Sequence, residues 1–293
     1  MNFNIKKAHR NVHEIIVESN KFKIAMLSDL HWDNPKCDRD LLKKHLDYCL
    51  KNEIPVMING DFFCLMQGRG DNRRNKNDIR PEHNNATYLD SVVNTAVEWF
   101  KPYAQILTVI GYGNHETAII KWQESDLLAR FVHLLNHEAG TNVQLGGYGG
   151  WLNIRMTHKN RNTAFNIKYF HGSGGGGIVT KGHINLSRAL QMYEGFDCFT
   201  MGHIHENTSR TDARETIKRT PKYGAKLHHH EVHLMVTGCY KEEFQDGFGG
   251  WHVERGAPIK PLGGRILHLE MMRKVDDEGD LLIKKCYSHR IIC

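Results

Sequence analysis

Carboxylate, amide and imidazole side chains follow several strand-like stretches of the sequence. In chain order these residues are Asp29, His31, Asp61, Asn114, His115, His171, His203 and His205. Ligands bind at the carboxyl ends of strands in an open α/β sheet. We therefore expect these side chains to meet at one edge of the fold.

The mixture of donor types indicates a metal site. Histidine is the commonest metal ligand, and Asp, Asn and His together suit Mn²⁺, Fe²⁺, Zn²⁺ or Ni²⁺. The D-x-H and H-x-H spacings predict two ligands on one side of an extended chain, because residues i and i+2 share a face. Two ions about 4 Å apart need a bridging carboxylate, and Asp61, which follows Gly60, can approach both closely.

Alternating strands and helices position these residues in the first half of the chain. The apolar patterns predict strands at 21–28, 54–60 and 105–111 and helices at 38–52, 86–100 and 125–137. Asp38 is the predicted N-cap of the first helix, and Ser125 is predicted to open the third. This alternation indicates an α/β architecture with a largely parallel sheet.

The second half is rich in strands. Strand patterns occur at 149–158, 163–170, 196–202 and 230–238, a hairpin pattern at 265–288, and one helix near 184–194. A second sheet packed on the first accounts for this pattern. Because no repeat and no long linker interrupts the chain, we predict a single domain over residues 1–293.

The order D-x-H, G-D, G-N-H-E, H and G-H-x-H resembles the calcineurin-like metallophosphoesterase superfamily. The resemblance covers Asp29 to His205, roughly sixty per cent of the 293 residues. It implies a four-layer α/β/β/α sandwich of two mixed sheets with a dinuclear metal site at the sheet edge. It also implies hydrolysis of a phosphate ester with two divalent ions, Mn²⁺ in the first place and Fe²⁺, Zn²⁺ or Ni²⁺ as alternatives.

The resemblance assigns a role to each of these residues. Its implied ligands are Asp29, His31 and His205 for one ion, Asn114, His171 and His203 for the other, and Asp61 as the bridge between them. His115 matches the family's catalytic histidine, which is not a ligand and helps the leaving group.

Departures from the family pattern indicate which branch of the superfamily the sequence resembles. The family's G-D-x-x-D reads GDFFC here, so Cys64 stands at the second acidic position. The arginines of the Ser/Thr phosphatases are absent, because Leu65 follows Cys64 and Tyr112 with Gly113 precedes the G-N-H-E asparagine. His115 stands where the lipid-A-precursor hydrolases carry Arg. The pattern is closest to the nucleases and phosphodiesterases.

Two stretches favour a nucleic-acid substrate such as DNA. The polar segment 67–85, predicted as a mobile loop beside the metals, carries the cations Arg69, Arg73, Arg74, Lys76 and Arg80. The segment 239–256 offers a stacking surface for unpaired bases with Tyr240, Phe244, Phe248 and Trp251. The alternatives are a small-nucleotide phosphodiesterase, a phosphomonoesterase, or a non-catalytic scaffold with the same fold.

The composition of the chain bears on the charge of its substrate, its cellular compartment and its contact with membranes. A formal charge of +6 and a pI near 8.9 fit an anionic substrate. Seven cysteines without a C-x-x-C pair favour reduced thiols in a cytoplasmic setting. No apolar run approaches the roughly 18 residues of a membrane span, and the N-terminus lacks the apolar core of a signal peptide. We therefore expect a cytoplasmic protein without membrane contact.

Three other features of the sequence have structural interpretations. The stretch HGSGGGGIVTKG contains G-x-G-x-x-G at Gly172, Gly174 and Gly177, but a run of four glycines satisfies this dinucleotide fingerprint by accident. We expect a flexible loop beside His171 instead. LHHHEVH (227–233) is predicted to be a strand with exposed histidines. Glu116 steadies the turn or a histidine near the metals, or is solvated.

Overall fold

The structure is a computed structural model that describes residues 3–67, 74, 76–220, 224–242, 244, 251–254, 256–276 and 279–292. One sheet, sheet A, contains β1 (Phe3–His9), β2 (Val12–Glu18), β7 (Gly149–His158), β8 (Arg161–Phe170), β9 (Cys198–Met201), β10 (Thr208–Thr220) and β11 (Gly224–Val236). The other, sheet B, contains β3 (Lys21–Leu27), β4 (Val56–Asn59), β5 (Leu107–Gly111), β6 (Gln144–Leu145), β12 (Arg265–Asp276) and β13 (Gly279–Arg290).

The helices are α1 (Arg39–Lys51), α2 (Tyr88–Phe100), α3 (Asn114–Gln123), α4 (Leu127–Ala139), α5 (His183–Met192) and α6 (Trp251–Glu254). Short 3-10 turns occur at η1 (Lys76–Asp78), η2 (Pro81–His83) and η3 (Lys101–Ile106). Within the described residues, no helix is long and apolar enough to cross a membrane.

Both sheets are mixed. The strand order of sheet A is β1-β2-β7-β8-β9-β11-β10, and that of sheet B is β13-β12-β3-β4-β5-β6. In sheet B, β3, β4, β5 and β6 are parallel neighbours, whereas β12 pairs antiparallel with β3. The predicted α/β class with two mixed sheets is confirmed.

Three apolar clusters hold the layers together. One lies between sheet B and the helices α1, α2 and α4, and α1 contributes Leu42, Leu46 and Cys49 to it. The second fills the space between the two sheets, with Ile15 from sheet A opposite Met26 from sheet B among its members. The third joins α5 to sheet A. Burial of apolar surface on both faces of each sheet is what fixes the sandwich.

The two sheets do not divide the chain into halves as the sequence suggested. The N-terminal hairpin β1–β2, which was not predicted, joins sheet A because β2 pairs in parallel with β7. The C-terminal hairpin β12–β13 joins sheet B beside β3. β10 was also missed, because its residues alternate little in polarity and most of them are exposed.

The helix ends confirm one predicted cap and correct another. The Asp38 side chain accepts a hydrogen bond from the Leu41 amide at the start of α1. The helix predicted to open at Ser125 is capped instead by Asp126, which accepts from the Ala129 amide. A carboxylate accepts this bond well and also favours the positive end of the helix dipole.

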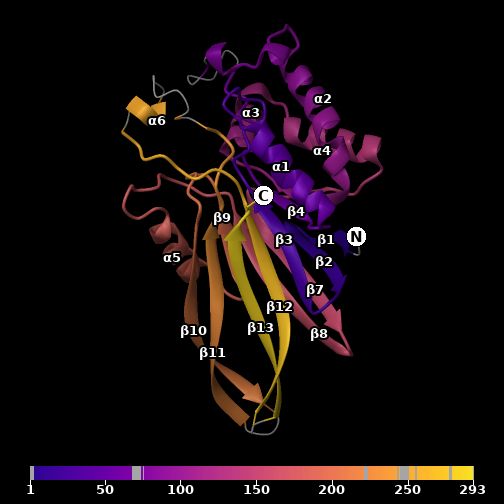
Figure 1. The fold of residues 1–293 in the computed structure, drawn as a ribbon, viewed down its shortest axis with the longest axis vertical. Helices are drawn as coiled ribbons and strands as arrows, with labels where there is room; N and C mark the ends of the chain where they lie inside the picture. Colours follow the sequence, from indigo (N-terminus) through magenta and orange to yellow (C-terminus); the bar gives the residue numbers. More distant parts are fainter. Residues whose placement is uncertain are drawn as a thin grey trace.

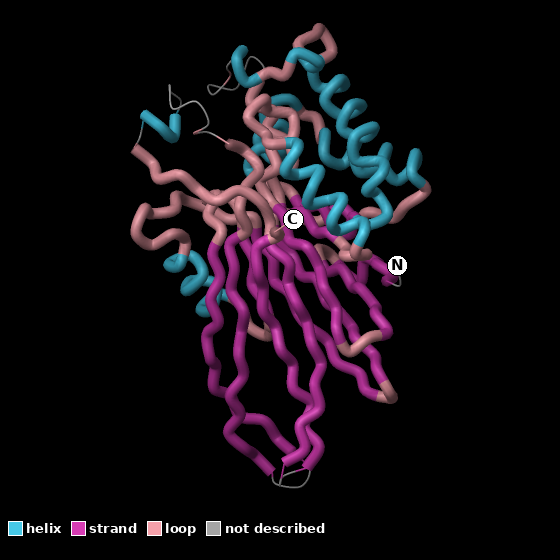
Figure 2. The backbone as a smooth tube through the Cα atoms, viewed as in Figure 1, coloured by secondary structure: helices cyan, strands magenta, loops and turns pink. Residues whose placement is uncertain are grey.

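The molecule is elongated, and its chemistry-bearing loops gather in one region. Helices α1 to α4 lie together at one end, and the strands of the long hairpins extend away from them (Figure 1). Figure 2 shows the loops gathered at the strand ends nearest these helices. All but one of the residues predicted to bind metal lie in these loops, and the exception, Asn114, is the first residue of α3.

Candidate metal centre

Two pairs of loops carry the predicted ligands and are joined by backbone hydrogen bonds. Beyond the end of β3, the Asp29 amide donates to the Gly60 carbonyl, and the His31 amide donates to the Asp61 carbonyl, both at 3.0 Å. The loops after β8 and β9 are joined in the same way, because the Gly202 amide donates to the His171 carbonyl at 2.8 Å. Neighbouring strands therefore continue their contact far enough to bring their ligands side by side.

Most of these ligands have left-handed backbone conformations. The residues concerned and their φ angles are Asp29 (53°), His31 (46°), Asp61 (47°), His203 (68°) and His205 (57°). The expectation of an extended chain in D-x-H and H-x-H was therefore wrong. Asp29 and His31 still lie in one ligand group, whereas His203 and His205 lie in different groups. A left-handed non-glycine residue costs of order 1–3 kcal/mol, and such residues cluster at functional sites.

Three glycines permit the close packing of this region. A Cβ atom on Gly60 would meet the His171 ring, and one on Gly113 would meet the Asp61 carboxylate, both at under 3.0 Å. A Cβ atom on Gly202 would meet the Asp29 carboxylate equally closely. The glycines of the G-D, G-N-H-E and G-H-x-H patterns therefore have a steric reason.

The first ligand set consists of Asp29, His31 and His205. One ligand atom from each lies within 4.8 Å of the others. The Nε2 atoms of His31 and His205 are 3.4 Å apart, and His205 Nε2 is 3.4 Å from Asp29 Oδ1. The Asp29 side chain is fully buried and also accepts hydrogen bonds from the Ser28 hydroxyl and the His203 amide.

The second ligand set consists of Asp61, Asn114, His171 and His203. The Asp61, His171 and His203 ligand atoms lie within 4.8 Å of one another. Asn114 Oδ1 joins them at 2.8 Å from His203 Nδ1 and 3.2 Å from His171 Nε2. The two groups match the grouping that the resemblance implied, with Asp61 in the second. Metal binding by these residues and the bridging role of Asp61 stay predictions.

His115 lies beside these ligands. Its ring packs edge-on against His31, with centroids 4.8 Å apart, and its Nε2 atom is 3.9 Å from Asp61 Oδ2. Its Nδ1 atom is 2.5 Å from the carbonyl oxygen of Cys64. Since a carbonyl only accepts, Nδ1 carries a proton, and Nε2 faces the ligands.

Glu116 is buried and anchors two of the loops. Its carboxylate accepts hydrogen bonds from the amides of Asp61, Phe63 and Gly113. Burial raises the pKa of Glu116 to about 8, and the nearby Asp61 charge acts in the same direction. The prediction of a solvated Glu116 was wrong, and the hydrogen bonds agree with the prediction that it steadies the turn.

The charges of the site depend on each other. Burial alone would lower the pKa of His171, but the Asp61 carboxylate, 3.2 Å from its Nε2, outweighs burial and raises the pKa to about 10. Burial opposes ionisation of Asp61, yet His171 and His115 hold its pKa well below the ordinary value. Burial lowers the pKa of His31 well below its ordinary value, and the His115 charge adds to this.

The donor set fits divalent cations. Asp29 and Asp61 are buried, and their ion-pair partners among the described residues are histidines, with no lysine or arginine. A buried carboxylate needs a compensating positive charge. Neutral imidazole, amide oxygen and carboxylate together suit Mn²⁺, Fe²⁺ or Zn²⁺.

Several supporting residues were missed in the sequence. Asp33 is buried, and its carboxylate accepts hydrogen bonds from the Cys64 and Leu65 amides and from the Tyr88 hydroxyl. The Thr237 hydroxyl lies 2.5 Å from that of Ser28, behind Asp29. The position of Asp33, two residues after the D-x-H pattern, could have indicated its role. No sequence pattern near Thr237 indicates a role for that residue.

Lys241 was also not predicted from the sequence. It lines a small hollow beside His205 and Cys239, held there by a backbone bridge to Cys37. Its charge contributes to the lowered pKa of His31, after the larger effects of burial and His115. A cation at this position faces the first ligand set.

The residues predicted to bind substrate do not form one group in the structure. Arg69 and Arg73 lie outside the described residues, as do Phe248 and the Trp251 side chain. Arg74 is exposed. Arg80 was wrongly assigned to substrate, because its guanidinium donates to the carbonyls of Asn34 and Cys37. Tyr240 was also wrong as a stacking residue, because it is fully buried with its hydroxyl 2.8 Å from His45 Nδ1.

Comparison with known proteins adds little. No family model and no curated protein matches the chain. One similar solved structure is GAP50, described as the anchor in the inner membrane complex of Plasmodium, with 12% identity, a TM-score of 0.42, and coverage of 93% of this chain and 89% of that one. Another is Vps29 of Chaetomium thermophilum, with 10% identity, a TM-score of 0.31, and coverage of 92% and 98%. At these TM-scores neither likeness carries an argument.

Proposed function

We propose that this protein is a metal-dependent phosphodiesterase of the calcineurin-like metallophosphoesterase kind, acting on nucleic acid. The observation that carries this proposal is the meeting of the two ligand sets beside His115, on segments that follow five different strands. A structural metal site would use one compact ligand set. It would not need the additional imidazole of His115 beside its ligands. We further propose two Mn²⁺ ions as cofactors and the cytoplasm as the location.

The chain's own residues divide the work. The first set (Asp29, His31, His205) would hold one ion, and the second set (Asp61, Asn114, His171, His203) the other. When bound, such ions polarise a phosphate and supply hydroxide at neutral pH. Glu116 keeps the Asp61 loop and the start of α3 in register through its three amide hydrogen bonds.

His115 is placed to assist the leaving group. Its Nδ1 proton is held by the Cys64 carbonyl, so the ring cannot rotate without losing that bond. Nε2 therefore points to the ligands, where the protonated ring donates a hydrogen bond or a proton to the departing oxygen. Lys241, beside the first set, adds a positive charge that favours an anionic substrate.

The substrate class rests on fewer observations. The basic segment after Asp61 begins in the metal-centre loop, and its exposed Arg74 is available to a phosphate backbone. The stacking surface, by contrast, loses Tyr240. Nucleic acid therefore remains the proposal on charge alone, with a small nucleotide as the competing substrate.

The test is a turnover screen with Mn²⁺. Substrates are bis-p-nitrophenyl phosphate, p-nitrophenyl phosphate, cyclic nucleotides, and single- and double-stranded DNA. We expect hydrolysis of the diester and of DNA, dependent on metal, and absent from an Asp61→Ala variant purified in the same way. Metal binding without turnover of any substrate would favour the non-catalytic scaffold.

A further inference from the structure

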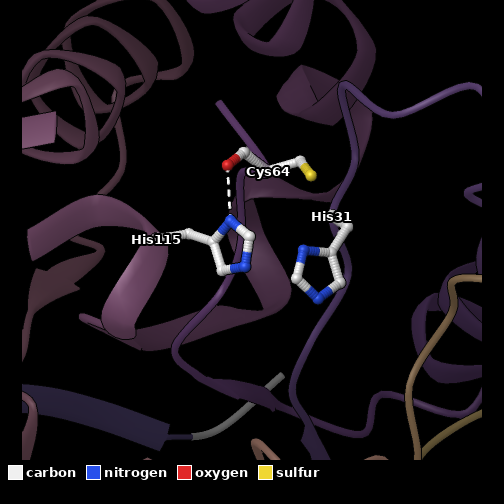
Figure 3. Close-up of side chains that lie close together, drawn as sticks. All are labelled: His31, Cys64 and His115. Carbon is white, nitrogen blue, oxygen red and sulfur yellow. Dashed lines mark hydrogen bonds between the residues drawn. The ribbon is translucent and has the colours of Figure 1, made fainter. Parts of the chain in front are cut away.

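Three side chains beside the metal centre form another group of ligand atoms. They come from His31 after β3, Cys64 after β4 and His115 at the start of α3, and their ligand atoms lie within 4.8 Å of one another. Figure 3 shows the two rings facing each other with the sulfur beside them. Cys64 is only 3% exposed, and the Asn34 side-chain amide donates to its sulfur at 3.4 Å.

His31 has two differently used nitrogens. Its Nε2 atom faces His205 in the first ligand set, at 3.4 Å from His205 Nε2. Its Nδ1 atom is buried and has no hydrogen-bond partner among the described residues. In Figure 3 one nitrogen of His31 faces the His115 ring and the Cys64 sulfur, while the other points away. A buried polar atom without a partner is costly, and here it is turned toward two metal-binding groups.

His115 is already oriented as a ligand. Metal-binding histidines usually donate their other N–H to a carbonyl or carboxylate, which fixes the tautomer. The Cys64 carbonyl does this for His115 Nδ1, so in the neutral ring Nε2 is the nitrogen that carries the lone pair. The same residue therefore supplies the carbonyl that orients one ligand and the sulfur that serves as another.

We propose that His31, Cys64 and His115 form an alternative, inhibitory site for a thiolate-preferring ion such as Zn²⁺, which shares His31 with the first set. Thiolate ligands select such ions over Mn²⁺, which prefers oxygen. A tetrahedral Zn²⁺ with bonds of about 2.0–2.3 Å would draw the three atoms to roughly 3.5 Å apart and leave a fourth position for water. On binding, the S–H bond breaks, its proton goes to solvent and an S–Zn bond forms, with no change in oxidation state.

Inhibition follows from the residues that the ion takes, and this part rests on the proposed function. A neutral His31 that binds through Nδ1 carries its proton on Nε2 and is lost from the first set. His115 that binds through Nε2 can no longer donate to a leaving group. An ion at this site therefore removes one ligand and the donor together.

The binding test uses Co²⁺, which absorbs in the near-ultraviolet when a thiolate binds it. Metal-free protein is titrated with Co²⁺ in the wild type and in the Cys64→Ser, Cys239→Ser and Cys49→Ser variants. We expect the band in the wild type and Cys49→Ser, and its loss in Cys64→Ser. Cys239→Ser matters because Cys239 lines the hollow beside His205 and is the competing source of thiolate. A band that survives in Cys64→Ser, or never forms in the wild type, would overturn the proposal.

The activity test separates this site from the proposed function. Zn²⁺ is titrated against Mn²⁺-dependent turnover of bis-p-nitrophenyl phosphate, and we expect Cys64→Ser to need at least about tenfold more Zn²⁺ for half inhibition. Equal inhibition of both proteins would mean that Zn²⁺ acts only in the two main sets. If no turnover occurs, the Co²⁺ band still decides the site. Cys64→Ala, with its fold checked by circular dichroism, replaces Cys64→Ser if the latter misfolds.

Discussion

The Nδ1 atom of His115 and the carbonyl oxygen of Cys64 lie 2.5 Å apart, on loops that follow different strands. The family pattern would place a carboxylate at residue 64. Here the backbone of that residue orients the histidine, and no side chain is needed for it. The Cys64 thiol therefore takes no part in orienting His115, whose imidazole is held by the backbone carbonyl.

Removing the His115 imidazole should affect turnover and spare the metals. His115→Ala is expected to lower kcat by about a hundredfold or more, the usual scale for a proton donor, with unchanged Mn²⁺ content. Steady-state kinetics and elemental analysis of the same Mn²⁺-loaded sample test this. Loss of Mn²⁺ from His115→Ala would show that the histidine belongs to one of the two main ligand sets.

Removing the Asp61 carboxylate should affect the metals directly. Asp61→Ala is expected to lose metal as well as activity, because its carboxylate contacts His171 and is the proposed bridge. Elemental analysis should find two ions per chain in the wild type and fewer in the variant. A fully active wild type holding at most one ion would refute the dinuclear site.

Gly113 should tolerate no side chain. A Cβ atom there would overlap the Asp61 carboxylate, so Gly113→Ala is expected to lower metal affinity and turnover by at least about tenfold. Gly175→Ala is the matched control, because a Cβ atom at Gly175 meets nothing within 4 Å. Titration calorimetry with Mn²⁺ compares the two. Equal affinities would show that the Asp61 loop can move aside.

The folded protein should lose stability in mild acid through His233. This ring is buried between the sheets, with Nε2 2.8 Å from the Ser288 hydroxyl. Burial, then the Arg265 charge, lowers the pKa of His233 from 6.5 to about 4. Above pH 6.5 neither state is protonated here and the contribution is complete. As the pH falls from 6.5 to about 4, only the unfolded state binds the proton, so stability falls.

Urea unfolding at several pH values measures this effect. The slope from one histidine is about 1.4 kcal/mol per pH unit at most. His233→Gln should have a shallower slope than the wild type in that window, whereas exposed His9→Gln should not. A slope unchanged in His233→Gln would assign the acid sensitivity to other groups.

The basic segment should contribute to nucleic-acid binding without affecting small substrates. Replacing Arg73 and Arg74 together with Ala is expected to weaken DNA binding and to reduce the salt slope of the binding constant by about two. Turnover of bis-p-nitrophenyl phosphate should not change. An unaltered DNA affinity and slope would favour a small-nucleotide substrate.

The sequence predicted the grouping of the ligands better than their conformations. Strand ends in parallel neighbours must meet, so Asp29, Asp61 and Asn114 could be brought together from the pattern alone. The left-handed backbone at Asp29 and His31 was not predictable, because it depends on hydrogen bonds to a loop that follows another strand.

Long-range partners account for the other errors. Arg80 looked like a substrate cation because the carbonyls that hold it belong to residues 34 and 37, far away in sequence. Tyr240 looked like an exposed aromatic among glycines, yet its hydroxyl meets His45 in α1. The N-terminal hairpin β1–β2 belongs to sheet A because β2 pairs in parallel with β7. The C-terminal hairpin β12–β13 belongs to sheet B because β12 pairs antiparallel with β3. Both pairings join segments that are far apart in the sequence.

The position of β12 beside β3 also sets the order in which the protein can mature on the ribosome. β3 leads directly into Asp29, but its neighbour β12 is translated more than two hundred residues later. The Asp29 carbonyl likewise receives its hydrogen bond from the amide of Tyr240. A nascent chain therefore exposes one side of β3 for most of its synthesis, a situation that invites chaperone binding or mispairing. The candidate metal centre can gain its contact with Tyr240 only when most of the chain has emerged.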